Sequence, residues 1–207
     1  MYLVMEDLGS VGYPILSGSV NPNTVQTCIK WLARFHAFHL NVKPIHLWER
    51  GSYWHLKTRP DELEKLFTED PDLAEVADCI DEGLRNSPFQ TLIHGDAKMA
   101  NFCFSVDGHK TAAVDFQYVG EGIGMQDLAY FIGSCLSESE CANQESQILN
   151  SYFLELRQAA NLSTFSNSTL DELEISWRKL YPYAWADFQR FLKGWSPGHW
   201  KVNGYSE

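Results

Sequence analysis

Apolar side chains recur every three or four residues over most of the chain, and this spacing predicts a mainly helical protein. Val25, Ile29 and Leu32 lie on one face of a helix that opens at Asn21-Pro22, where proline fits because the first helical N–H groups have no partner within the helix. The same spacing predicts further helices over residues 61–67, 71–85, 125–136, 142–160 and 170–192.

Short apolar runs bounded by turn-forming residues predict strands between these helices. Residues 91–94 and 101–105 are two such runs, and residues 110–116 are expected to pair with them as a hairpin. The Asp107-Gly108 pair supports this hairpin, because glycine readily adopts the left-handed conformation that tight hairpin turns require. No internal repeat and no linker-like tract is visible. The chain is therefore predicted to be one α+β domain, mainly helical, with a small β-hairpin.

The composition is that of a folded domain. With 207 residues, of which 44% are hydrophobic and 21% charged, the chain is long and apolar enough to bury a core. Its net charge of −11 and its pI near 5.0 disfavour a nucleic-acid or anionic-membrane partner, because both would repel an acidic surface. No run of apolar residues is long enough for a membrane-spanning helix.

Cysteine usage and the first residues favour a cytoplasmic protein. The five cysteines are odd in number and form no Cys-x-x-Cys pair, so neither a zinc site nor a disulfide framework is expected. Reduced thiols of this kind are typical of the cytoplasm. The apolar start at Met1 is short and has no basic segment before it, so no signal peptide is expected.

The most specific pattern follows the strand predicted at residues 91–94. It reads His94-x-Asp96-x-x-x-x-Asn101, and Asp115 comes nineteen residues after Asp96, beyond the hairpin turn. An aspartate on a loop after a strand is well placed to accept the proton of a substrate hydroxyl, and such help is worth about 10² to 10⁴ in rate. The amide oxygen of Asn101 and the carboxylate of Asp115 suit Mg²⁺, which shares its coordination with phosphate oxygens. The pattern therefore predicts phosphoryl transfer.

Several segments, in order along the chain, resemble the C-terminal lobe of the small-molecule kinases of the aminoglycoside phosphotransferase and choline kinase superfamily. The nearest likeness is to its ecdysteroid-kinase-like and choline-kinase-like members. The matching segments are residues 2–8, 31–37, 94–101, 115–117 and 122–131. The resemblance implies the C-terminal lobe of a protein-kinase-like fold and an ATP- and Mg²⁺-dependent transfer to a hydroxyl of a small molecule.

The resemblance also implies a role for each matching residue. Asp96 would be the catalytic base, and Lys98 would lie near the transferred phosphate, where a cation stabilises charge. Asn101 and Asp115 would be the Mg²⁺ ligands. His94 and Asp127 would brace the loop.

The first residues resemble the hinge strand that lies against the nucleotide base in these kinases. Residues 1–8 would be the remnant of this strand, with Met5, Glu6 and Leu8 contacting ATP, and residues 9–207 would be the C-terminal lobe. The N-terminal lobe, with its glycine-rich phosphate cover and strand lysine, is not found in the sequence. A strand at residues 2–5 would then lack pairing partners, which would permit self-association through its edge.

Two other functions stay open. A kinase-like lobe without its partner lobe would be a catalytically incomplete fragment that acts as a binding or scaffold module. Alternatively, His36, His39, His94 and Asp96 would hold the metal of a hydrolase. His36 and His39 lie on an otherwise apolar helical face, however, where a core histidine is more common. Beyond a small-molecule hydroxyl, the acceptor is not indicated.

Three further features have functional interpretations. The stretch from Gly120 to Gly124 is expected to be flexible and near the substrate entrance. Asp187 and Glu174 are candidate partners for a cationic acceptor. Aromatic residues that either cage such a cation or belong to the core are Trp177, Tyr181, Tyr183, Trp185, Trp195 and Trp200.

Overall fold

Helices make up most of the computed structural model, which describes residues 4–16, 21–160 and 164–195. The first helix, α1 (Pro22–Phe38), is capped by the Asn21 side chain, whose oxygen accepts hydrogen bonds from the N–H groups of Asn23 and Thr24. The predicted helices are confirmed, with ends shifted by a few residues. The other helices are α2 (Pro60–Glu69), α3 (Pro71–Arg85), α4 (Gly124–Cys135), α5 (Glu138–Ala159) and α6 (Asn167–Trp195).

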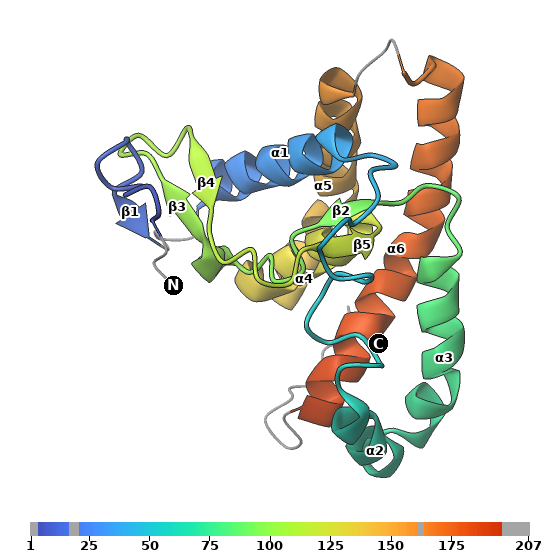
Figure 1. Cartoon of the computed structure of the whole chain (residues 1–207). Helices are drawn as coiled ribbons and strands as arrows, with labels where there is room; N and C mark the ends of the chain where they lie inside the picture. Colours follow the sequence, from blue (N-terminus) through green and yellow to red (C-terminus); the bar gives the residue numbers. More distant parts are fainter. Residues whose placement is uncertain (1–3, 17–20, 161–163, 196–207) are drawn as a thin grey trace.

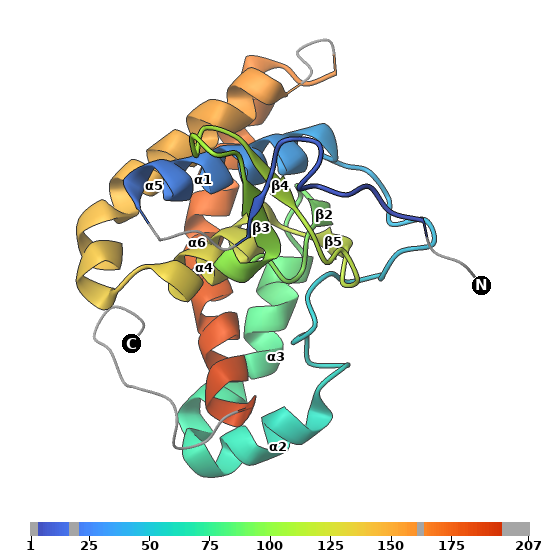
Figure 2. The same cartoon turned by 90° about the vertical axis from the view of Figure 1, so that its left-hand side faces the viewer.

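The helices form two groups that share the long helix α6. In the first group, α1 packs along α5 and α4 packs against α6; in the second, α2 and α3 pack against α6 (Figures 1 and 2). The core lies mainly in the first group, where Leu32, Phe131, Tyr152 and Trp177 are fully buried. None of the described helices is both long and apolar enough to cross a membrane.

Two small antiparallel sheets lie beside the helices. The described strands are β1 (Ile15–Leu16), β2 (Thr91–Ile93), β3 (Phe102–Phe104), β4 (Thr111–Ala113) and β5 (Gly120–Gly122). One sheet has the order β1-β3-β4, and the other pairs β2 with β5. The hairpin predicted across Asp107-Gly108 is confirmed for β3 and β4. The prediction is wrong for β2, because its partner is β5 rather than β4.

The glycine-rich stretch that ends at Gly124 is not the flexible segment that the sequence indicated. Gly120 and Gly122 are buried in β5, and Gly124 begins α4. A β-carbon on Gly120 would collide with the carbonyl oxygen of Trp48 and the amide nitrogen of Gly51. Glycine is therefore required at position 120 because the backbone packs closely against residues 48–51, and not because the segment is flexible.

The strand expected at residues 2–5 is not formed where the structure describes it. Residues 4–7 belong to no strand, Val4 and Met5 are exposed, and residues 2 and 3 lie outside the described residues. A strand requires a neighbour to pair with its backbone, and no described strand pairs with this segment. The chain turns back on itself soon afterwards, where the N–H of Tyr13 donates to the carbonyl oxygen of Leu8 at 2.8 Å.

A buried carboxylate lies on α2, which packs against α6. Glu62 is 2% exposed, and neither of its carboxylate oxygens has a hydrogen-bond partner. Its nearest cation is Arg59, at 3.8 Å between Nε and Oε1. Burial raises the pKa of Glu62 to about 7, and the charge of Arg59 only partly opposes this rise.

We expect Glu62→Gln to stabilise the protein at pH 8 but not at pH 5. A carboxyl whose pKa is higher in the folded state than in the unfolded state contributes stability below its unfolded pKa, and this contribution is lost as pH rises through about 7. The gain at pH 8 should be roughly 1–3 kcal/mol, since each unit of pKa shift corresponds to about 1.4 kcal/mol. Thermal unfolding at both pH values measures it.

The matched control for this measurement is Glu64→Gln, which removes an exposed carboxylate from the same helix. Its unfolding temperature should follow the wild type at both pH values. An equal effect of Glu62→Gln at pH 5 and pH 8 would contradict the account of this residue.

Candidate active site

The strand β2 leads directly into the loop that carries the predicted catalytic pattern. Gly95 adopts a left-handed conformation with φ of +80°. A β-carbon at this position would collide with the carbonyl oxygen of Tyr118 and the amide nitrogen of Ser52. Glycine therefore allows the loop to turn sharply between two other segments of backbone, and Asp96 follows immediately after this turn.

Asp127, in the first turn of α4, holds this loop in place through hydrogen bonds. Its carboxylate is fully buried and accepts hydrogen bonds from the backbone N–H groups of His94 at 2.6 Å and Gly95 at 3.0 Å. It also pairs with Nε2 of His36 at 3.0 Å, and the other ring nitrogen of His36 meets the hydroxyl of Tyr152 at 2.8 Å. One carboxylate thus joins α1, α4 and the catalytic loop.

The pKa of Asp127 reflects these partners. Burial on its own raises the pKa, but the hydrogen bond and charge of His36 and the backbone N–H of Gly95 outweigh it. The net result is a pKa below the usual value for aspartate, so the carboxylate is ionised at neutral pH.

His94 contacts both the loop that carries Asp96 and the segment that leads to Asp115. Its Nε2 lies 2.9 Å from the carbonyl oxygen of Val114, and its Nδ1 accepts the backbone N–H of Asp96 at 3.2 Å. This pattern fits the tautomer that carries its proton on Nε2. Phe116 covers the imidazole with a ring separation of 4.8 Å. His94 therefore connects the loop before Asp96 to the strand that leads to Asp115.

Asp96 is almost completely buried, with 2% exposure, yet only one of its carboxylate oxygens is used. Oδ2 accepts hydrogen bonds from Nζ of Lys98 at 3.0 Å and from Nδ2 of Asn101 at 2.9 Å. Oδ1 is buried and has no hydrogen-bond partner. A buried carboxylate oxygen without a donor is costly, so this atom is available to a donor that arrives with a substrate.

Asn101 shapes the end of the same loop. Besides its bond to the Asp96 carboxylate, its Nδ2 donates to the backbone oxygen of Asp96 at 2.7 Å. The backbone carbonyl oxygen of Asn101 accepts a hydrogen bond from the backbone N–H of Val114 at 2.9 Å. Among the described residues nothing donates to the side-chain oxygen of Asn101, which leaves that atom free to bind a cation.

Asp115 follows Val114 in the chain and has an unusual backbone conformation. Its φ is +65°, a conformation that non-glycine residues rarely adopt and that often marks functional positions. The side chain is exposed, and no described residue forms a hydrogen bond with it. Asn101 and Asp115 together offer an amide oxygen and a carboxylate, which suit Mg²⁺ when phosphate oxygens and water complete the shell.

The predicted nucleotide contacts are not joined to this centre. Met5 and Glu6 are exposed and Leu8 is half-buried. No hydrogen bond or ring contact between described residues connects these three positions to the catalytic loop.

Two tyrosines that the sequence did not single out stand beside Asp96. Tyr53 comes from the segment between α1 and α2, and Tyr130 comes from α4. Their hydroxyl oxygens lie 3.4 Å apart. Burial raises the pKa of both hydroxyls. For Tyr130, the hydrogen bond with Tyr53, the charge of Asp96 and a hydrogen bond to the Asp96 carboxylate raise the pKa further. No spacing in the sequence connects Tyr53 with the catalytic loop, because only the fold brings them together.

The alternative site of a metal-dependent hydrolase is not formed. His36 and His94 use both ring nitrogens in the contacts given above, and Nδ1 of His39 lies 2.8 Å from the carbonyl oxygen of Phe35. Across the described ranges no group of three or more histidine, cysteine or acidic side chains could hold a metal ion.

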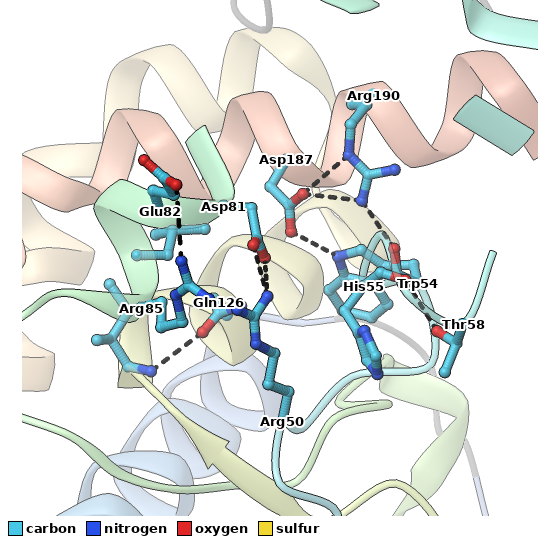
Figure 3. A network of polar contacts seen from close by, with 12 residues as sticks. Arg50, Trp54, His55, Thr58, Asp81, Glu82, Arg85, Gln126, Asp187 and Arg190 are labelled. Carbon is cyan, nitrogen blue, oxygen red and sulfur yellow. Dashed lines mark hydrogen bonds and ion pairs between the residues drawn. The ribbon is translucent and has the colours of Figure 1, made fainter. Parts of the chain in front are cut away.

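The candidate partners of a cationic acceptor are already paired within the protein. Asp187 accepts hydrogen bonds from Arg190 at 2.8 and 2.9 Å and from Nε1 of Trp54 at 3.1 Å, as Figure 3 shows. Glu174 is paired with Arg157 and Arg178 in the same way. Both carboxylates are neutralised, so neither is free to attract a cation.

Three of the six aromatic residues considered for a cage belong to the core instead. Trp177, Tyr181 and Trp185 are buried, whereas Tyr183 and Trp195 are about half exposed. Trp200 lies outside the described residues.

A comparison with family models decides the family. The model of the ecdysteroid kinase-like family matches residues 57–165, which is more than half of the chain and includes Asp96, Asp115 and Asp127. The chain belongs to the ecdysteroid kinase-like family. The resemblance found in the sequence is thereby confirmed. No curated protein matches the chain in a sequence search.

One solved structure confirms the predicted fold class. An ethanolamine kinase from Plasmodium vivax is similar with a TM-score of 0.53 at 15% identity, over 94% of this chain and 61% of that protein. A choline/ethanolamine kinase family protein from Mesorhizobium loti is similar with a TM-score of 0.47 at 14% identity, over 89% of this chain and 57% of that one.

An aminoglycoside-3'-phosphotransferase of type VIII has a TM-score of 0.44 at 14% identity, over 81% of this chain and 65% of that one. This chain spans about three fifths of the length of the ethanolamine kinase and of the choline/ethanolamine kinase family protein. At these identities the likeness concerns the fold: a mainly helical kinase-like lobe with a small antiparallel sheet.

We expect Asp127→Asn to destabilise the protein by about 2–4 kcal/mol at pH 7, because the amide presents its own N–H groups to buried donors. The wild-type carboxylate has a lowered pKa in the folded state, so its contribution is present above the unfolded pKa of 3.8 and is lost as pH falls below it. The difference between the two proteins should therefore narrow below about pH 4.

Urea unfolding at pH 7 and pH 3 measures this difference, with Asp72→Asn on the exposed surface of α3 as the control. A variant at position 127 as stable as the wild type at pH 7 would show that the carboxylate does not hold the loop.

Proposed function

We propose that the chain is the catalytic lobe of an ATP- and Mg²⁺-dependent phosphotransferase that acts on a hydroxyl of a small molecule. The observation that carries this proposal is the state of Asp96. One oxygen is held by Lys98 and Asn101, and the other is buried without a donor. The ecdysteroid kinase-like family supports the same reaction class.

Asp96 has the geometry of a general base. Because Oδ2 is fixed by two donors, the carboxylate cannot rotate freely, and Oδ1 keeps one direction. An acceptor hydroxyl at Oδ1 would give its proton to this oxygen as its own oxygen bonds to the γ-phosphorus. The bond between that phosphorus and the bridging oxygen of ADP breaks, and ADP leaves with its electron pair.

Lys98, Asn101 and Asp115 supply charge and ligands around the phosphate. Nζ of Lys98 is partly exposed while it contacts Asp96, so it can also reach a phosphate oxygen. The oxygens of Asn101 and Asp115 would bind Mg²⁺, which neutralises phosphate charge when it is bound. By the resemblance of the first residues to a hinge, Met5, Glu6 and Leu8 would contact the nucleotide base.

The reaction is tested with purified protein, Mg·ATP and a panel of hydroxyl compounds: an ecdysteroid, ethanolamine and an aminoglycoside. Formation of ADP and of phosphorylated product are both measured. We expect Asp96→Asn to lower turnover by about 10² to 10⁴, because the base is lost, while the affinity for Mg·ATP changes little.

The control is Asp78→Asn, which removes an exposed carboxylate on α3 and should leave turnover unchanged. Full turnover in Asp96→Asn would overturn the role of Asp96. Binding of Mg·ATP without transfer to any compound of the panel would instead favour a binding or scaffold module.

A further inference from the structure

We propose that helix α2 is a proton-controlled arm of the molecule. It stays packed on α6 while Glu62 carries a proton, and it opens locally when Glu62 is ionised. The opening also releases contacts that the residue before α2 makes with Tyr53, which stands beside Asp96. This inference concerns a conformational change of the chain itself and does not depend on the proposed reaction.

Few contacts hold α2 in place. It lies at one end of the molecule, packed against α6 and beside α3 (Figures 1 and 2). Of its ten residues only Glu62 and Leu66 are buried, and no side chain caps its first turn. Helices shorter than about 12 residues are marginal in water and depend on tertiary packing. An element with so little burial is one that can open while the rest of the protein stays folded.

Glu62 lies directly on the interface between α2 and α6. A β-carbon on Gly194 of α6 would collide with the backbone carbonyl oxygen of Glu62, so the two helices touch at this residue. Neither oxygen of the buried Glu62 carboxylate has a hydrogen-bond partner. A buried carboxyl without donors is tolerated in its neutral form, whereas the ionised form needs a partner or water. Ionisation therefore favours a state in which α2 has moved and water reaches Glu62.

The cations near Glu62 are engaged elsewhere. Arg59 lies 3.8 Å away, and its Nε donates to the carbonyl oxygen of Tyr53 at 3.2 Å. Arg190 of α6 directs its Nε and Nη2 to the carboxylate of Asp187 (Figure 3). The charged and titratable groups around Glu62 and at the ends of α2, from every element packed there, are Tyr53, Arg59, Asp61, Lys65, Arg190 and the ion pair of Asp70 with Lys193.

The pH window of the opening follows from the pKa of Glu62 in the two states. Burial raises this pKa to about 7 in the closed state, whereas the ordinary value of 4.5 applies once water reaches the carboxyl. Below pH 4.5 both states hold the proton, and opening is least favourable. Between these two values only the closed state holds it, so opening becomes more favourable as pH rises. Above about 7 both states are ionised, and the effect is complete.

Arg59 carries the opening towards the active site. It directly precedes α2, and its guanidinium lies over the ring of Tyr53 at 5.8 Å in addition to binding the carbonyl oxygen of that residue. Besides burial, the charges of Asp96 and Glu62 raise the pKa of Tyr53, so this tyrosine lies near both carboxylates. When α2 opens, Arg59 leaves Tyr53, and the tyrosine loses two of the contacts that hold it.

The test is amide hydrogen exchange of the full chain at pH 5 and pH 8, read by mass spectrometry and corrected for the intrinsic effect of pH on exchange. Protection of α2 in the wild type should fall by about 10- to 100-fold from pH 5 to pH 8, because the proton stabilises only the closed state. At pH 8 this protection should lie at least about 10-fold below that of buried amides in α4, because the opening is local.

The variant Glu62→Gln keeps the shape of the side chain and removes its ionisation. Protection of α2 in this variant should be the same at pH 8 as at pH 5. The matched control is Glu64→Gln, which alters an exposed carboxylate on the same helix and should follow the wild type. Peptides over residues 53–59 should lose protection together with α2 in the wild type and keep it in Glu62→Gln.

A second measurement needs no variant. The carboxyl carbon of Glu62, followed by NMR in the wild type, should titrate with a midpoint near pH 7. A midpoint near 4.5 would show that the carboxylate is ionised inside the closed structure and would overturn the inference.

Three exchange results would also contradict the proton-controlled arm. Equal protection of α2 and α4 at pH 8 would mean that α2 opens only when the whole protein unfolds. The same pH dependence in Glu62→Gln as in the wild type would assign the effect to another group. Protection of wild-type α2 that does not change with pH would mean that ionised Glu62 turns to Nη1 of Arg190, which has no hydrogen-bond partner among the described residues.

Discussion

The buried carboxylate of Asp127 is the constraint on which the rest of the site depends. An ionised group without access to water is tolerated only when it is paired and hydrogen-bonded. Asp127 meets this condition by accepting from His36 on α1 and from the backbone of His94 and Gly95. The need to satisfy one charge therefore fixes two helices and the catalytic loop in a single arrangement.

Two different kinds of interaction then converge on Asp96. Lys98 and Asn101 hold one carboxylate oxygen through polar contacts within the loop. Aromatic packing brings Tyr130 of α4, and Tyr53 from a segment distant in sequence, close to the same residue. In the proposed reaction, the polar contacts within the loop would serve the phosphate and the metal.

Local patterns in the sequence predicted the parts of this structure that depend on local interactions. The helices follow from apolar spacing, and the hairpin follows from Asp107-Gly108. The pairing of β2 with β5 was missed, because strand partners are chosen by packing and not by sequence distance. Tyr53 was missed for the same reason. The strand expected at residues 2–5 needed a partner that local sequence cannot provide, and residues 4 and 5 do not form it.

The most direct test of the account is amide hydrogen exchange at His94 and Gly95 in the native protein. Both N–H groups donate to the buried Asp127 carboxylate, so their exchange should require global unfolding. We expect their protection to equal that of buried amides in α4. Exchange as fast as in the exposed turn at residues 107–109 would show that Asp127 does not hold the loop in the native protein. It would contradict the claim that this buried carboxylate fixes the catalytic loop.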